Sequence, residues 1–206
     1  MKKRVSLYFA ASCVTLLLFA CKPSMLDPFE YVQWIEDAGN GLKKSKEIDK
    51  IEFIVQFKTT DYILLKENSI NPLSEKEKFE NEKKELGDLQ YFTLKIKTPE
   101  GTDPLKFCLS GQDEYFARVK YYSFEIQNDL SLVDGSDTIQ CVLSHFERNY
   151  GIAPEITCLV GFPPKDKKSP SIEDKSLIYY DRVFNNGNLV FAFSKKDISQ
   201  TPKLKS

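Results

Sequence analysis

The chain has 206 residues, of which 29 are basic and 30 are acidic, so its formal net charge at pH 7 is −1. Because nucleic acids bind proteins that carry clustered positive charge, this mixed composition argues against DNA or RNA as a partner. The chain has one histidine and no Cys-x-x-Cys pair, so a zinc site has little support, and we assign no metal and no cofactor. The length suits one domain with a hydrophobic core of its own.

The first 20 residues have the pattern of a bacterial signal peptide. A basic cluster at positions 2–4 precedes an apolar stretch from about Val5 to Ala20. That stretch is somewhat short for a stable transmembrane helix, and no polar face interrupts it as in an amphipathic core helix. We therefore predict that residues 1–20 are removed. An uncleaved N-terminal anchor and ordinary secretory cleavage are the open alternatives.

Residues 18–21, with the sequence LFAC, resemble the lipobox of bacterial lipoproteins, although Phe19 is bulkier than the usual residue there. The resemblance implies that Cys21 receives a diacylglycerol thioether, that the chain is cut before it, and that its new amino group is acylated. Several acyl chains on one cysteine make a stable membrane anchor. Lys22 stands where an aspartate would resemble an inner-membrane retention signal. We therefore expect an envelope protein at the outer membrane, with its domain in the periplasm.

After a short tether at 21–26, the sequence predicts a single α+β domain over 27–200. Asp27 as a cap and Pro28 at the first helical position predict a helix that ends near Gly39 or Gly41. Cap residues and apolar periodicity predict the other elements of the N-terminal half of the domain. These are strands at 51–57 and 89–97, and helices at 62–66, 74–86 and 112–120.

In the second half, alternating apolar residues predict one long or bent strand over 124–132. Further strands are predicted at 138–147, 155–162, 177–182 and 188–194, the last two joined as a hairpin around Asn185-Asn186-Gly187. Residues 163–174 are expected to form an exposed loop, and 195–206 a polar, frayed end of which 201–206 is a tail. Short turns favour antiparallel pairing, so the predicted fold is α+β, with a largely antiparallel sheet of about eight strands. Three or four helices lie mostly in its N-terminal half.

Three cysteines remain after removal of the signal peptide and lipidation, in a compartment that permits disulfides. They are Cys108, Cys141 and Cys158. Three thiols cannot all pair within the chain, and Cys141 and Cys158 flank a predicted turn, so they are the candidate disulfide. The alternative is that all three are buried thiols that pack as small apolar residues.

His145 and Glu147 are two residues apart on a predicted strand and therefore share one of its faces. Their side chains are candidates for a binding site or for a general acid–base pair. A local dyad with Cys141 as the nucleophile fails, because four residues of strand separate Cys141 from His145 by about 13 Å. The alternative for His145 and Glu147 is an ordinary surface pair.

A second group, Tyr179, Asp181 and Arg182, places an aromatic, an acid and a base before a glycine turn. These residues could line a polar groove that binds sugar or peptide. The alternative is the end of a strand that carries an ion pair.

No GxSxG, HExxH, P-loop or GxGxxG motif occurs, and we assign no catalytic residue. The stretches CVLSHFERNYGIAPE and YYDRVFNNGNLVFAFSK look like uncharacterised lipoproteins of Gram-negative bacteria, a resemblance that implies no activity. The leading hypothesis is a membrane-anchored, non-enzymatic binding module whose partner is an envelope protein or a glycan. One alternative is an envelope hydrolase or isomerase that uses His145 and Glu147. Another is an inhibitor- or immunity-like lipoprotein whose 163–174 loop blocks a partner enzyme.

Overall fold

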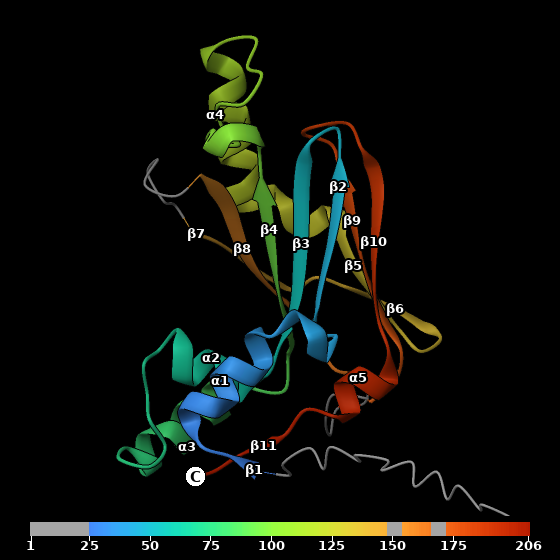
Figure 1. Ribbon diagram of the computed structural model, residues 1–206. Helices are drawn as coiled ribbons and strands as arrows, with labels where there is room; N and C mark the ends of the chain where they lie inside the picture. Colours follow the sequence, from blue (N-terminus) through green and yellow to red (C-terminus); the bar gives the residue numbers. More distant parts are fainter. Residues whose placement is uncertain (1–24, 148–153, 166–171) are drawn as a thin grey trace, which may run out of the picture.

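The computed structural model describes residues 25–147, 154–165 and 172–206. Two antiparallel sheets lie face to face with the hydrophobic core between them (Figure 1). The five-stranded sheet has the order β2 (Lys43–Ile48), β3 (Ile51–Lys58), β4 (Gln90–Lys97), β8 (Glu155–Phe162) and β7 (Leu143–Glu147). The four-stranded sheet has the order β10 (Gly187–Phe193), β9 (Lys175–Asp181), β5 (Leu130–Asp134) and β6 (Asp137–Gln140).

Helices lie at both ends of this pair of sheets. The helices are α1 (Pro28–Glu36), α2 (Thr60–Lys66), α3 (Lys76–Leu86), α4 (Gln112–Lys120) and α5 (Lys195–Ser199). Helices α1 to α3 gather at one end, and α4 projects at the other (Figure 1). Two short terminal strands, β1 (Met25–Leu26) and β11 (Lys203–Leu204), pair in parallel at the end that carries α1 to α3.

Aromatic rings fill the space between the sheets. Phe92 of β4 lies at the centre, and the centroids of Phe57, Phe162 and Phe193 are 5.2, 5.9 and 5.5 Å from its own. Phe193 comes from the four-stranded sheet, so this cluster joins the two layers. Inward-facing aromatic and aliphatic residues alternate with outward-facing polar ones along the strands, as expected for sheets buried on one face.

The predicted α+β class is confirmed, and so is the antiparallel pairing. Helix α1 begins as the sequence indicates, because the Asp27 carboxylate accepts hydrogen bonds from the backbone N–H groups of Phe29 and Glu30, both at 3.0 Å. The predicted strands at 51–57, 89–97 and 155–162 are present, as is the hairpin around 185–187. Helix α3 begins at Lys76, two residues after the predicted start at 74, and its N-cap, Glu75, makes no side-chain capping bond.

The prediction of a strand over 124–132 is wrong for its first half. A π-helical turn at Tyr121–Glu125 and a 3-10 turn at Ile126–Asp129 continue α4, and β5 begins only at Leu130. Tyr122 and Ile126 are both buried and lie four residues apart, a helical spacing that the strand interpretation missed.

The predicted strand at 138–147 is in fact two strands in different sheets. The backbone N–H of Cys141 still donates to the carbonyl of Leu130 on β5, whereas that of Val142 donates to the carbonyl of Gly161 on β8. The chain thus passes from one sheet to the other between residues 141 and 142, which is a connection that alternation along the sequence does not reveal.

The first and last described segments are both part of the fold, which was not predicted for positions 25–26 of the tether or for the frayed tail. Leu26 and Leu204 are buried and are paired across β1 and β11. Residues 195–199 form α5, whose N-cap Ser194 accepts a bond from Asp197 N–H at 3.1 Å. The signal peptide and Cys21 lie outside the described residues. Within 25–147, 154–165 and 172–206, no helix is both long and apolar enough to cross a membrane.

Candidate functional site: a polar hollow on the five-stranded sheet

The predicted groove at Tyr179, Asp181 and Arg182 does not exist as a surface site. Tyr179 and Asp181 are buried, and the Asp181 carboxylate accepts bonds from Asn186 Nδ2 at 2.8 Å and from a backbone N–H of the hairpin turn. Exposed Arg182 forms an ion pair with Asp129. Asp181 therefore organises the β9–β10 turn, which agrees with the alternative of a strand end that carries an ion pair.

His145 and Glu147 do share the outer face of β7, as predicted. Phe146 between them points inward, with its ring 5.9 Å from that of Tyr122. Both flanking residues are exposed and lie opposite Leu159 and Thr157 of β8 in the strand register. Glu147 also lines a hollow on this face of the sheet, which His145 does not.

The candidate disulfide is not formed, and Cys108, Cys141 and Cys158 are free thiols. Cys158 is buried on the inner face of β8, where its register partner on β7 is Phe146. Cys141 precedes β7, and its thiol donates a hydrogen bond to the carbonyl of Leu143 at 3.0 Å. Cys108 is exposed, contrary to the alternative of three buried thiols.

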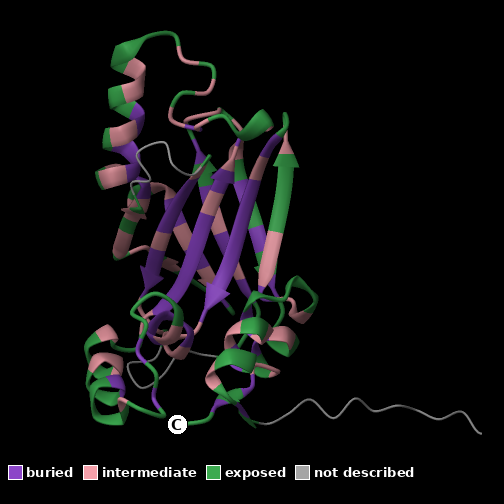
Figure 2. Cartoon of the chain, turned by 60° about the vertical axis from the view of Figure 1, so that its left-hand side comes forward, coloured by how far each residue is buried: buried purple, intermediate pink, exposed green. Residues whose placement is uncertain are grey.

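A hollow of about 460 Å³ lies over the outer face of the five-stranded sheet. We call it the sheet hollow. Its floor is formed by outward-facing residues of the three central strands, all of which are buried: Ile54, Gln56, Thr93 and Thr157. Figure 2 shows how much of these strands is buried although no second sheet covers this side. Buried polar residues are unusual in the centre of a sheet, and here they indicate a surface that binds another molecule.

Thr93 is the central residue of the floor. It is 3% exposed, and its hydroxyl has no hydrogen-bond partner among the described residues. A buried hydroxyl without a partner costs free energy, about 1–3 kcal/mol in mutational data, which a ligand that bonds to it would recover. The neighbouring Gln56 is already engaged, because its Nε2 donates to the carbonyl of Ile35 at 3.0 Å.

Charged side chains form the walls of the hollow, and most of them are paired. Its lysines are Lys43, Lys58, Lys66, Lys95 and Lys97. Four of these five have acidic partners: Lys58 pairs with Glu67, Lys66 with Glu36, Lys95 with Glu155, and Lys97 with Glu52 and Glu155. The ammonium of Lys58 also lies 5.0 Å from the centre of the Tyr62 ring and so covers an aromatic of the wall.

Two wall residues keep unpaired charges. Lys43 on β2 and Glu147 on β7 have no ion-pair or hydrogen-bond partner within the described part of the chain. Because β2 and β7 are the two edge strands, four strand spacings separate them, which is about 19 Å. Among the described residues, the hollow therefore offers one free cation and one free anion at opposite edges, with an unpartnered hydroxyl between them.

Sequence reasoning found Glu147 and missed the rest of the hollow. The alternation in β3 and β4 identifies the apolar positions of these strands but does not indicate that the polar positions 56, 93 and 95 on the other face line one surface. Lys43 lies on β2, a strand that the sequence did not predict.

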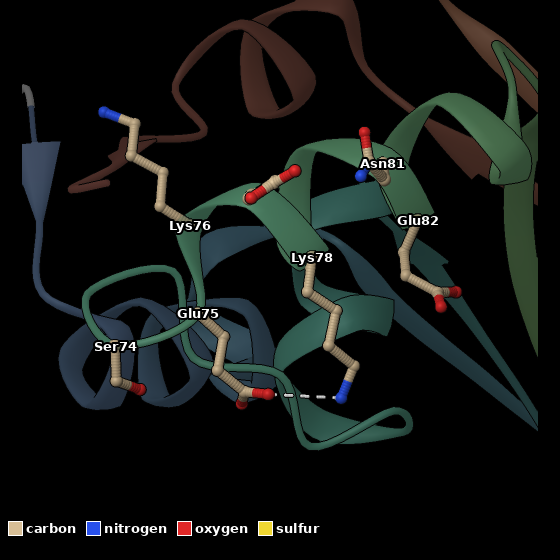
Figure 3. Close-up of a pocket in the computed structure, with 7 residues that line it drawn as sticks. Ser74, Glu75, Lys76, Lys78, Asn81 and Glu82 are labelled. Carbon is tan, nitrogen blue, oxygen red and sulfur yellow. Dashed lines mark hydrogen bonds and ion pairs between the residues drawn. The ribbon is translucent and has the colours of Figure 1, made fainter.

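A second hollow lies along the exposed side of α3 and is a weaker candidate. Figure 3 shows that Lys76, Lys78 and Glu82 extend away from one another instead of converging. The pair that is present, Glu75 with Lys78 at 3.2 Å, is a surface ion pair within the helix. These side chains therefore form a solvated charged face of α3.

Comparisons with known proteins give no function. No family model and no curated protein matches the chain. A crystal structure from Burkholderia pseudomallei, described as a novel protein of unknown function, aligns with 86% of this chain and 94% of its own. Its sequence identity is 11% and the TM-score is 0.35, so this likeness carries no argument.

Proposed function

We propose that this protein is a lipoprotein of the cell envelope, anchored through acyl chains on Cys21, and that it acts as a non-enzymatic binding module. We place it at the outer membrane with its domain in the periplasm. The basic cluster, the apolar stretch and the cysteine at its end support the anchor. The sheet hollow is its binding site.

The ligand that fits the sheet hollow is an extended peptide segment of an envelope protein. Lys43 would bind a carboxylate and Glu147 an ammonium, and the 19 Å between the edge strands matches about six residues of extended chain. A polyanion is disfavoured, because four of the five lysines are already paired. A sugar is disfavoured because the Tyr62 ring is covered by Lys58 and is not free for stacking.

The observation that carries this proposal is the unpartnered Thr93 hydroxyl on the floor, flanked by unpaired charges at both edges. On a face with only a structural role, we would expect such a buried hydroxyl to have a hydrogen-bond partner or to be replaced by an apolar group. The backbone of a bound peptide would supply a carbonyl or N–H group as the hydrogen-bond partner that the Thr93 hydroxyl lacks.

The anchor is tested with a Cys21→Ala variant. We expect the unaltered protein to sediment with membranes and to have an acylated N-terminus at Cys21 by mass spectrometry, and the variant to lose both properties. An unaltered chain that begins at Met1, or that has a free thiol at position 21, would refute the anchor.

The binding site is tested by photo-crosslinking in intact cells. The crosslinking amino acid replaces Ser45, which is exposed on the outer face of β2 and is the register partner of Ile54. We expect a reproducible protein adduct from position 45 that the charge swap K43E/E147K removes. The matched control swap is K76E/E80K on α3, which should leave the adduct unchanged. An adduct that persists in K43E/E147K, or no protein adduct at all, contradicts the proposal.

A further inference from the structure

The end of the domain that carries α1 to α3 also carries the first described residue of the chain. Met25 and Lys203 are register partners in β1 and β11, and the residues that follow them, Leu26 and Leu204, are buried. Because side chains alternate along a strand, Met25 and Lys203 face away from the core. Figure 1 shows this pair of strands beside α1 and α3, at the end opposite α4.

Large apolar side chains are exposed at this same end. Met25 is 55% exposed, Phe29 in the first turn of α1 is 71% exposed, and Leu73 in the α2–α3 connection is 56% exposed. Phe29 and Asn71 line one surface hollow, and the backbone N–H of Leu73 donates to Asn71 Oδ1 at 2.9 Å. The two elements that carry Phe29 and Leu73 are thus neighbours. Exposed apolar side chains that gather at one end of a domain indicate a surface that contacts another protein or a membrane.

The short length of chain between Met25 and Cys21 indicates that this contact is with the lipid bilayer. Cys21 and Met25 are four positions apart, and a chain of that length spans at most about 14 Å. If the acyl chains on Cys21 lie in the bilayer, this end of the domain lies within the headgroup region or directly against it. Lys203 and Lys205 are exposed there as well and match anionic headgroups.

We propose that Met25, Phe29 and Leu73 form a membrane face that lies on the lipid bilayer, with Lys203 and Lys205 directed to anionic headgroups. This inference rests on the proposed anchoring at Cys21 and adds a second contact to it. Each apolar side chain contributes little alone, but the anchor holds all three at high effective concentration near the bilayer. The membrane face also fixes the orientation of the domain, because α4 then points away from the membrane.

The test uses the full-length lipoprotein, reconstituted into vesicles of phosphatidylethanolamine and phosphatidylglycerol. An environment-sensitive fluorophore is attached to a cysteine introduced at position 73 in a C108S background. The control places the label at Phe124, which is 73% exposed in the π-helical turn that continues α4. We expect a lipid-borne quencher to quench the label at position 73 at least threefold more than the label at position 124. Equal quenching overturns the membrane face.

A protein partner on this face is the other outcome that overturns the proposal. In that case the label at position 73 would be shielded in native membranes but exposed to water in the pure lipid vesicles.

A second measurement separates this proposal from the anchor. The unacylated C21S chain is floated with the same vesicles, alone and with F29S/L73S or F116S/F124S, two pairs of substitutions at exposed sites. We expect F29S/L73S to lower the bound fraction at least fivefold and F116S/F124S to leave it unchanged. Equal binding of all three chains overturns the membrane face, whatever the N-terminal mass shows. An unmodified Cys21 with a selective effect of F29S/L73S refutes the anchor and leaves the face supported.

Discussion

Lys175 and Asp134 form an ion pair in which neither side chain has exposed surface, with Nζ 2.7 Å from Oδ1. They are register partners on β9 and β5 of the four-stranded sheet. Gln90 of the five-stranded sheet donates to the other oxygen of Asp134 at 3.0 Å. The result is a polar bridge between two sheets that otherwise meet through apolar side chains. Burial lowers the pKa of Lys175, and the Asp134 carboxylate opposes that shift.

Removal of the ammonium should strongly destabilise the protein. We expect K175M to lower the free energy of unfolding by about 3–5 kcal/mol, because it leaves the Asp134 carboxylate buried without its cation. Urea titration measures the change. The matched control is K195M, which removes the exposed pair with Glu173 and should cost about 1 kcal/mol or less. Equal midpoints for the two variants would show that the buried pair is not a structural requirement.

The three thiols should differ in reactivity. Cys108 is exposed, whereas burial raises the pKa values of Cys141 and Cys158 and thereby lowers their thiolate fractions. We expect a thiol reagent to modify Cys108 first and Cys158 only after unfolding by guanidinium. C108S should abolish the fast phase. A protein that releases fewer than three thiols on unfolding without reductant would instead contain a disulfide.

Much of the architecture follows from apolar alternation, and the exceptions have physical causes. The inner faces of β3, β4 and β8 carry enough apolar residues to identify these strands from the sequence. The inner face of β2 does not carry enough apolar residues to identify it, because this edge strand directs Lys44 and Lys46 inward. Their ammonium groups lie 6.0 and 5.8 Å from the ring centres of Phe193 and Phe191, so lysine stems cover the edge of the core.

The candidate site was less predictable than the fold, because its residues are distant in the sequence. Thr93 has no property that distinguishes it from a solvated strand residue until β3 and β8 are placed on either side of it. Asp181 and Tyr179 illustrate the opposite error, since their polar character suggested a surface groove. In the structure they are buried groups that belong to the turn and the core. The 163–174 loop of the inhibitor-like hypothesis lies only partly within the described residues.

Glu114 in the first turn of α4 should remain ionised in strong acid. The backbone N–H of Ser110 at 2.7 Å, its hydroxyl at 2.8 Å and Arg118 at 2.6 Å all donate to this carboxylate and lower its pKa from 4.5 to about 2. Since the folded-state pKa is depressed, the stabilisation is fully present above about pH 4.5 and is lost as the pH falls toward 2.

NMR titration of the Glu114 carboxyl carbon measures this pKa directly. We expect a midpoint near 2 in the unaltered protein. In S110A the midpoint should rise but stay below 4.5, because the backbone donor and Arg118 remain. A midpoint at the ordinary glutamate value in the unaltered protein would contradict the hydrogen bonds described at this helix start.

The C-terminal residues should contribute to stability although their composition resembles a frayed tail. Leu204 is buried beside Leu26, and the backbone N–H of Lys205 donates to the carbonyl of Leu26 at 2.8 Å. We expect L204A to lower the free energy of unfolding by about 2–5 kcal/mol, the usual cost of a cavity at a buried leucine. K203A, one position earlier and exposed, should change it by about 0.5 kcal/mol or less. If thermal unfolding gave the same midpoint for both variants, the pairing of β1 with β11 would be dispensable, and the domain would hold its N-terminal segment only through α1.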